Sequence, residues 1–149
     1  MTFTVLINSD TASPLNFSQE RLEDIIIFHL ENGTDHYIEV RGEFLRTCLG
    51  NTLGNLVRHP QPLRDNQPLP LDSPLALSVP KELHCMLGYL VERALEQPRL
   101  FQDTGSNAEI QHIVDLLDTG GSLSTYNGSA QSMAGCLIFF LESLAEPVV

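Results

Sequence analysis

The side chains that most often carry chemistry are present in this sequence, but they are not grouped at spacings that create a metal site. There are five histidines and three cysteines in 149 residues. The histidines are His29, His36, His59, His84 and His112. A metal site requires ligands that converge, as in His-Glu-x-x-His or paired Cys-x-x-Cys, and neither pattern occurs. We therefore expect no metal and no cofactor, and we interpret the histidines as scattered imidazoles.

The motifs give no better support to a covalent or phosphate-binding mechanism. A nucleophilic serine or cysteine needs a base and an orienting acid, and the sequence has no Gly-x-Ser-x-Gly elbow. The segment Gly50–Gly54 carries a pair of glycines, but no Lys-Ser or Lys-Thr follows them as in a phosphate-binding loop. We interpret this segment as a turn, and the motifs alone predict no enzyme.

Charge and composition exclude several other classes of function. The chain has 8 Lys+Arg against 19 Asp+Glu, a formal charge of −11. Nucleic acid and anionic membrane surfaces would repel such a chain. The N-terminus has no signal-peptide pattern, and the longest apolar run, Cys136 to Leu141, is far shorter than the ~20 residues of a membrane span. Widely spaced cysteines fit a reducing compartment. We expect a cytoplasmic chain that reaches membranes only indirectly.

The first part of the chain, residues 2–57, has the pattern of β-structure. Phe3, Val5 and Ile7 alternate with other residues, as expected for a strand with one apolar face. The runs 24–30 and 37–41 are also strand-like, and the Asn32-Gly33 pair between them predicts a hairpin turn. We expect loop structure over 45–57. Three strands cannot close a sandwich, so this part is expected to belong to a larger sheet.

The second part of the chain changes to a Pro-rich segment and then to helical periodicity. Residues 58–79 contain five prolines, which predict a linker, and a helix is expected from Pro80 until Pro98 ends it. On that helix the expected apolar face is Leu83, Leu87, Leu90, Val91 and Leu95.

Two further helices are expected after it. Ser106 and Glu109 have the spacing of a capping box at the start of a helix that Gly120-Gly121 stops. Its expected apolar stripe is Ile110, Ile113, Val114 and Leu117. A third helix is expected from Ser129 to Leu144. Its expected buried residues are Met133, Leu137, Phe140 and Leu141.

Several stretches of this sequence resemble one particular family. Leu22 to Gly50 resembles the last strands of the ASH domain, an immunoglobulin-like β-sandwich, of OCRL-type and type II inositol polyphosphate 5-phosphatases. The sequences Val-Pro-Lys-Glu-Leu at 79–83, Leu-Phe-Gln-Asp-Thr-Gly at 100–105 and residues 137–148 resemble the first part of the RhoGAP-like domain that follows it.

The resemblance implies an α+β chain in two incomplete pieces. It implies C-terminal strands of an ASH domain over 1–57, the Pro-rich linker over 58–79 and the first helices of an all-α RhoGAP-like domain over 80–149. The catalytic phosphatase domain of the family has no counterpart here, so a fragment or a truncated gene product is expected, without enzymatic activity of its own.

The resemblance also allows RhoGAP chemistry to be tested at individual positions. Active members insert an arginine into the GTPase site from a Gly-Ile-Phe-Arg-x-Ser-Gly-like loop, and Gln102 stands at that position here. The supporting Lys and Arg positions are Ile138 and Glu142. A neutral amide cannot replace a guanidinium, so an inactive domain is expected. Arg99, three residues earlier, is the alternative finger.

The partners implied by the resemblance are GTPases and peptides. The family's ASH domain binds Rab GTPases in part by β-augmentation, and Tyr37 and Ile38 are the candidate contacts, unless they pack within the sandwich. The helical part binds Rho-type (Rac-like) GTPases and Phe-and-His peptides of endocytic adaptors. His84 replaces a groove tryptophan, which puts the peptides in doubt, and an ordinary exposed helix residue is the alternative there.

These implications predict a non-catalytic adaptor region of a phosphatidylinositol 4,5-bisphosphate 5-phosphatase. It would recruit the phosphatase to endosomal, Golgi and endocytic membranes through Rab and Rho-type GTPases. The alternative is an active GTPase activator for Rho-family proteins in signal transduction.

Overall fold

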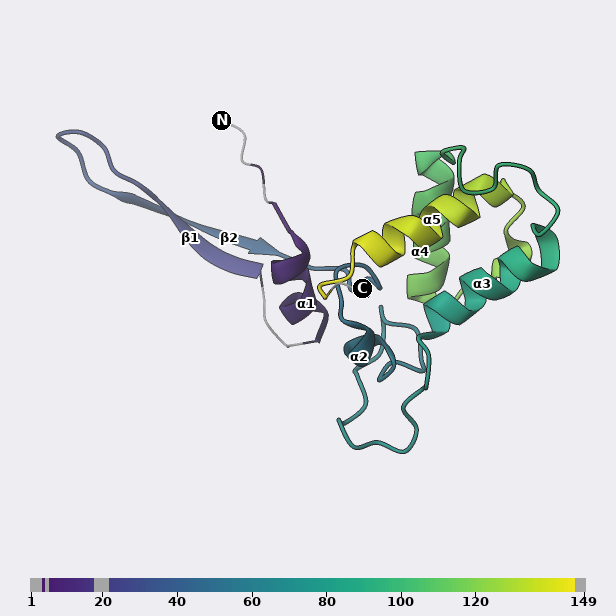
Figure 1. Ribbon diagram of the computed structural model, residues 1–149. Coiled ribbons are helices and arrows are strands. Elements are labelled where there is room, and N and C mark those ends of the chain that lie inside the picture. Colours follow the sequence, from purple (N-terminus) through teal and green to yellow (C-terminus); the bar gives the residue numbers. More distant parts are fainter. Residues whose placement is uncertain (1–3, 5, 18–21, 147–149) are drawn as a thin grey trace.

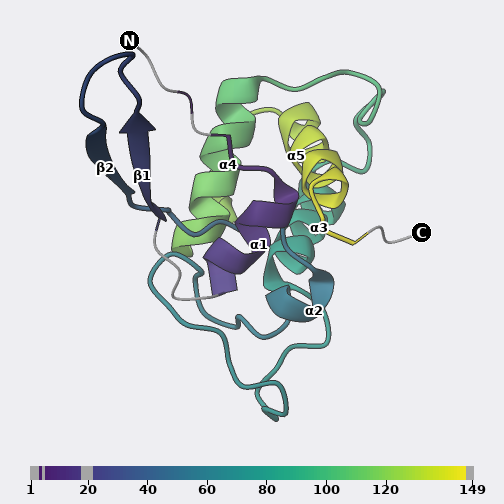
Figure 2. The same cartoon turned by 90° about the vertical axis from the view of Figure 1, so that its left-hand side faces the viewer.

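The computed structural model describes residues 4, 6–17 and 22–146, and within them the chain is α+β. Helices and strands follow in the order α1 Ser9–Phe17, β1 Leu22–Phe28, β2 His36–Gly42, α2 Leu53–Leu56, α3 Lys81–Arg93, α4 Asn107–Thr119, the 3-10 helix Leu123–Thr125 and α5 Ala130–Glu142. The β1–β2 hairpin extends away from α3, α4 and α5, which pack together (Figure 1). Helix α1 lies between the hairpin and these three helices in Figure 1, and Figure 2, seen from the hairpin side, shows α1 in front of them with α2 below it.

The hairpin has the turn that the sequence predicts. Strands β1 and β2 are antiparallel, with Ile26 opposite Ile38 and Ile27 opposite Tyr37. Asn32 has the positive φ of 62° that a tight turn requires, and the Gly33 amide donates to the Leu30 carbonyl at 3.1 Å. The prediction of a hairpin with Asn32 and Gly33 at its turn is confirmed.

Both faces of this hairpin are apolar and largely exposed. Because side chains alternate along a strand, Ile25, Ile27 and Tyr37 lie on one face, and Ile26 and Ile38 lie on the other. Exposure reaches 56% for Ile25 and 67% for Tyr37. A strand with two apolar faces has the pattern of a strand at the centre of a larger structure.

Residues 9–17 form a helix, so the expectation of β-structure is wrong over this range. Phe3 and Val5 of the expected first strand lie outside the described residues. The amide of Ala12 donates to the Asn8 carbonyl at 2.8 Å, which begins α1. Asn16 is buried and links α1 to the segment after the hairpin, accepting from the Thr47 amide at 2.9 Å. The sequence of α1 has no apolar periodicity by which the helix could be recognised.

The segment 45–79 packs against the helices. Part of the expected loop is the short helix α2, whose N-cap Thr52 accepts from the Asn55 amide at 3.1 Å. Leu56 and Leu63 are fully buried in the same core as the helices. Although residues 58–79 have no helix or strand, backbone bonds such as Leu77 N–H to the Val57 carbonyl at 2.8 Å hold them in place. The Pro-rich segment is therefore irregular but is not an extended spacer.

The three long helices share one core. Met86 of α3, Ile113 of α4, and Met133 and Phe140 of α5 are fully buried. The expected stripe of α4 is confirmed, with Ile113, Val114 and Leu117 buried and Ile110 partly buried. Three of the four residues expected to be buried in α5 are buried, and Leu141 is 39% exposed.

The expected apolar face of α3 is confirmed at Leu90, which is buried, and at Leu83, which packs partly against the core, but it is wrong at the other three positions. Met86 and Leu90 point into the core, whereas Leu87 is 43% exposed and Val91 60%. The helix ends at Arg93, several residues before Pro98, so Leu95 lies beyond its last turn. Glu82, in the first turn of α3, is fully buried and paired with Lys81. Charged residues are seldom buried, so the sequence pattern could not indicate a face that includes Glu82.

The stop of α4 and the start of α5 follow the sequence. Gly120 caps α4 in the left-handed region with φ 76°, and the Gly121 amide donates to the Leu116 carbonyl at 2.7 Å. Ser129 caps α5, because its side chain accepts from the Ser132 amide. No helix among the described residues is long and apolar enough to cross a membrane.

A buried carboxylate joins α4 to the segment after the hairpin. Asp118 is 1% exposed, and its Oδ1 accepts from the Cys48 amide at 2.7 Å. Its Oδ2 lies 3.7 Å from Nη2 of Arg64. Burial raises the pKa of Asp118 above its usual value, and the Cys48 amide opposes this rise. The carboxylate is thus retained in the interior by an amide that lies outside any helix or strand.

We expect Asp118→Ala to destabilise the fold by ~1–3 kcal/mol, because it leaves the buried Cys48 amide without its acceptor. Asp118→Asn keeps an acceptor oxygen and should cost less. Urea unfolding followed by circular dichroism measures both. Asp115→Ala is the matched control, since this exposed residue also pairs with Arg64. Equal losses for Asp115→Ala and Asp118→Ala would contradict this role.

Candidate functional site

The loop that carries Gln102 connects α3 to α4 and turns at Arg99. Arg99 has a positive φ of 57°, and its carbonyl accepts from the amides of Gln102 at 3.0 Å and Asp103 at 3.3 Å. This turn leaves Phe101 57% exposed. The loop then reaches α5 at Gly105, where a Cβ would overlap the Ser132 backbone. Only glycine allows so close an approach.

Hydrogen bonds between the starts of α4 and α5 hold this loop. The Ser106 amide donates to Oγ of Ser132 at 2.8 Å. Oε2 of Glu109 accepts from Oγ of Ser129 at 2.8 Å and from its amide at 3.1 Å. The hydroxyl of Tyr126 also donates to Oε2, at 3.1 Å. These bonds join the loop, α4 and α5 into one unit.

The capping box expected at Ser106 and Glu109 is therefore wrong, although the helix it predicts is present. Ser106 stands at the N-cap, but its side chain makes no capping bond. The hydroxyls of Ser132 and Ser129 and the Ser129 amide instead lower the pKa of Glu109 to about 2. Burial and the bond to Glu109 raise the pKa of Tyr126 to about 12.

The structure brings Gln102, Ile138 and Glu142 to one pocket. This pocket has a volume of about 220 Å³ and lies between the 100–105 loop and α5. Phe101 and Phe139 also line it. Among the described residues that line it there are two carboxylates and no basic side chain. An amide, an alkyl group and a carboxylate supply none of the positive charge that stabilises a transferring phosphoryl group.

The other candidate contact residues lie elsewhere. Tyr37 and Ile38 are neighbours in β2, so they point to opposite faces of the hairpin, and Ile38 is 49% exposed. His84 is exposed near the start of α3 and lines a second pocket of about 280 Å³. In that pocket the guanidinium of Arg93 lies 5.2 Å from the centre of the Tyr89 ring. These residues therefore do not form a single site with Gln102.

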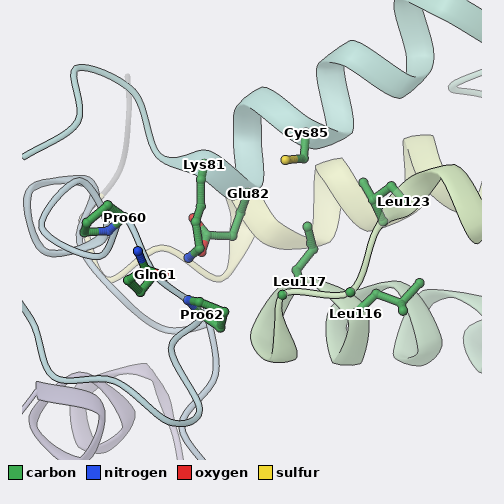
Figure 3. Close-up of a pocket in the computed structure, with 11 residues that line it drawn as sticks. Pro60, Gln61, Pro62, Lys81, Glu82, Cys85, Leu116, Leu117 and Leu123 are labelled. Carbon is green, nitrogen blue, oxygen red and sulfur yellow. The ribbon is translucent and has the colours of Figure 1, made fainter.

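A larger pocket, about 360 Å³, lies between the Pro-rich segment and the helices (Figure 3). Pro60 and Pro62 line one side, and Lys81, Glu82 and Cys85 line the other. Lys81 and Glu82 form an ion pair with each other. None of the site residues expected from the sequence is among its described lining residues. The pocket is thus separate from the Gln102 site.

Comparison with known proteins supports the class that the sequence indicates. Residues 1–44 match the family model of the ASH domain of OCRL-like inositol polyphosphate 5-phosphatases. The chain is also 36% identical, over 161 aligned residues, to the type II inositol 1,4,5-trisphosphate 5-phosphatase of Mus musculus. The alignment covers 97% of this chain and 16% of that protein. The resemblance is confirmed: the chain is related to the OCRL-like and type II inositol polyphosphate 5-phosphatases.

Sequence reasoning did not find the residues that position the pocket. Ser129 was expected only as a helix start, and Ser132 and Tyr126 were assigned no role, yet all three contact each other or Glu109. The signal that could have found them is the polar Ser-x-x-Ser pattern at the start of an otherwise apolar helix.

The low pKa of Glu109 predicts an acid-sensitive contact between α4 and α5. Because the pKa falls from the ordinary 4.5 to about 2 on folding, the contact contributes stability above pH 4.5 and loses it as the pH falls toward 2. Glu109→Gln should remove this part of the pH dependence. The test is to measure the urea concentration at the midpoint of unfolding across that pH range, for the wild type and for the variant.

Glu96→Gln, at an exposed carboxylate beyond α3, controls for the change in net charge. It should keep the acid sensitivity of the wild type. An unchanged pH profile in Glu109→Gln would show that the hydrogen bonds to Ser129 do not couple to folding.

Proposed function

We propose that this chain is a non-catalytic, GTPase-binding part of an inositol polyphosphate 5-phosphatase. It recruits the phosphatase to endosomal, Golgi and endocytic membranes by binding Rab and Rho-type GTPases. The observation that carries the proposal is the match of residues 1–44 to an ASH domain, together with a hairpin whose apolar side chains are largely exposed. Phosphatase activity is assigned to the rest of the longer protein, since this chain aligns with 16% of its mouse relative.

The hairpin supports binding by β-augmentation. Among the described residues, β2 pairs only with β1, so its other edge is open to a further strand. A GTPase sheet can extend such an edge, and exposed side chains then add specificity. Tyr37 and Ile38 are the proposed contacts, because they place a ring and a branched chain on opposite faces of β2.

The helical part supports binding of Rho-type GTPases without activation. Gln102, Ile138 and Glu142 stand where active members of the RhoGAP class carry three cations, and they line one pocket. Arg99 is exposed and is not among the described lining residues. The alternative, an active GTPase activator, is disfavoured for this reason. Binding of endocytic adaptor peptides at His84 is disfavoured as well, because an exposed imidazole is a weaker anchor than an indole.

Tyr37→Asp should abolish binding to GTP-loaded Rab, because it places a carboxylate at the centre of the proposed contact. Biolayer interferometry against a panel of Rab GTPases, each loaded with GTP or GDP, measures this. Thr34→Asp adds the same charge at the hairpin loop and should leave binding intact. Unaltered affinity of Tyr37→Asp would remove Tyr37 from the interface.

Single-turnover GTP hydrolysis by a Rac-type GTPase should not accelerate in the presence of this chain. Arginine fingers contribute ~10³–10⁵ in rate, so an intact finger would be obvious. Gln102→Arg alone should not restore activity, because Glu142 lines the same pocket. Acceleration by the wild-type chain would establish the alternative function, and its loss in Arg99→Ala would then identify the finger.

A further inference from the structure

The pocket at Gln102 has an apolar interior that is open to a partner. Leu100 and Ile110 pack partly against the helical core, while Phe101, Ile138 and Phe139 are exposed by 57%, 38% and 40%. All five line the same space of about 220 Å³. That volume is several times the ~30 Å³ of a water molecule in the liquid and is sufficient for one large apolar side chain. Exposed aromatic groups around a pocket are typical of a protein-binding site.

The ionisable side chains that line this pocket have one sign of charge. Asp103 and Glu142 are the ionisable side chains among its described lining residues. The chain as a whole carries −11. An acidic partner, an anionic membrane or a nucleic acid would meet repulsion here, whereas lysine or arginine side chains would be attracted. The apolar interior therefore favours a ligand with an apolar side chain, and the acidic lining residues favour basic groups beside it.

The pocket is also held in shape before any partner binds. The loop that forms one wall is fixed to α5 through the Ser106–Ser132 hydrogen bond and the close approach at Gly105. Gly135 of α5 leaves room beside Ile110, whose Cδ1 would lie 3.4 Å from an added Cβ. Binding to a preformed pocket costs less conformational entropy than binding to a mobile surface, because fewer side chains and loop residues must be ordered.

We infer that this pocket docks a basic protein segment that inserts one large apolar side chain and places lysine or arginine beside Asp103 and Glu142. The apolar side chain enters between Phe101 and Phe139, and the flanking cations pair with the carboxylates. This docking requires no nucleotide chemistry. It does not rest on Rab binding by the hairpin, because the two surfaces share no residue.

Peptide titration of the full chain, followed by nuclear magnetic resonance, tests the inference. The probe is a short peptide with a central Leu-Phe pair flanked by lysines, and a glutamate-flanked Leu-Phe peptide and a lysine-flanked Gly-Ser peptide are its controls. We expect saturable shifts of the amides of residues 100–105 and 135–142 with the first peptide alone. Equal shifts with the Gly-Ser peptide would reduce the site to general charge attraction and overturn the inference.

Two variants localise the effect. Ile138→Asp and Glu142→Lys should each weaken the lysine-flanked Leu-Phe peptide about tenfold or more, the loss expected of a central contact residue. Glu96→Lys makes the same charge change as Glu142→Lys outside the pocket and should change the affinity less than about twofold. Equal weakening in both lysine variants, or none in either pocket variant, would overturn the inference.

Two further measurements distinguish this pocket from the hairpin surface and from a membrane-binding surface. Tyr37→Asp should bind the peptide as the wild type does, so failure of the Rab proposal and failure of this one are distinguishable. Vesicles that contain phosphatidylserine should produce no shifts at residues 100–105. Vesicle-induced shifts there, in the absence of peptide binding, would assign the pocket to membranes and contradict a protein partner.

Discussion

The contact between the start of α4 and the start of α5 is the constraint on which the helical part depends. Oγ of Ser132 accepts a hydrogen bond from the Ser106 amide. The carboxylate of Glu109 accepts hydrogen bonds from the hydroxyl and the amide of Ser129. Helix starts leave amides without internal partners, and here each helix satisfies groups of the other. Because Gly105 has no side chain, the loop comes close enough for these bonds to form. The same contact holds the loop that carries Gln102 beside α5.

A second polar contact lies between the helical part and the segment after the hairpin. Asp118 accepts the amide of Cys48 in the interior, 70 residues away in the sequence. This bond attaches the segment after the hairpin to α4, and Leu56 and Leu63 complete the attachment by burial. On the hairpin, by contrast, Ile25 and Ile38 stay exposed. A two-stranded sheet of this kind is marginal alone, so further protein surface is expected to cover it.

Local signals in the sequence predicted local structure well. Asn32 and Gly120 adopt positive φ, as their residue types favour, and the hairpin turn and the end of α4 follow directly. Long-range polar contacts could not be predicted in the same way. Glu109 was paired with the nearest serine in sequence, but its partner is 20 residues away. Likewise α1 has no apolar stripe and contacts the rest of the chain through the buried Asn16, and the buried face of α3 includes Glu82.

The candidate site was predicted only in part. The resemblance named Gln102, Ile138 and Glu142, and the structure places all three at one pocket. Periodicity indicated that Leu137 and Phe140 are buried, but it could not show that Phe139 would remain exposed beside the loop. That depends on how near the loop approaches α5, and Gly105 and Ser132 decide this through tertiary contacts.

The carboxylates that line the pocket bear on what an arginine at position 102 could do. A guanidinium at position 102 would share a small space with the carboxylates of Asp103 and Glu142. Opposite charges attract, so these carboxylates would compete with a phosphate for the guanidinium. A cation directed at a phosphate would therefore need changes at both position 102 and position 142, whereas the apolar and basic segment proposed above would pair with the same carboxylates.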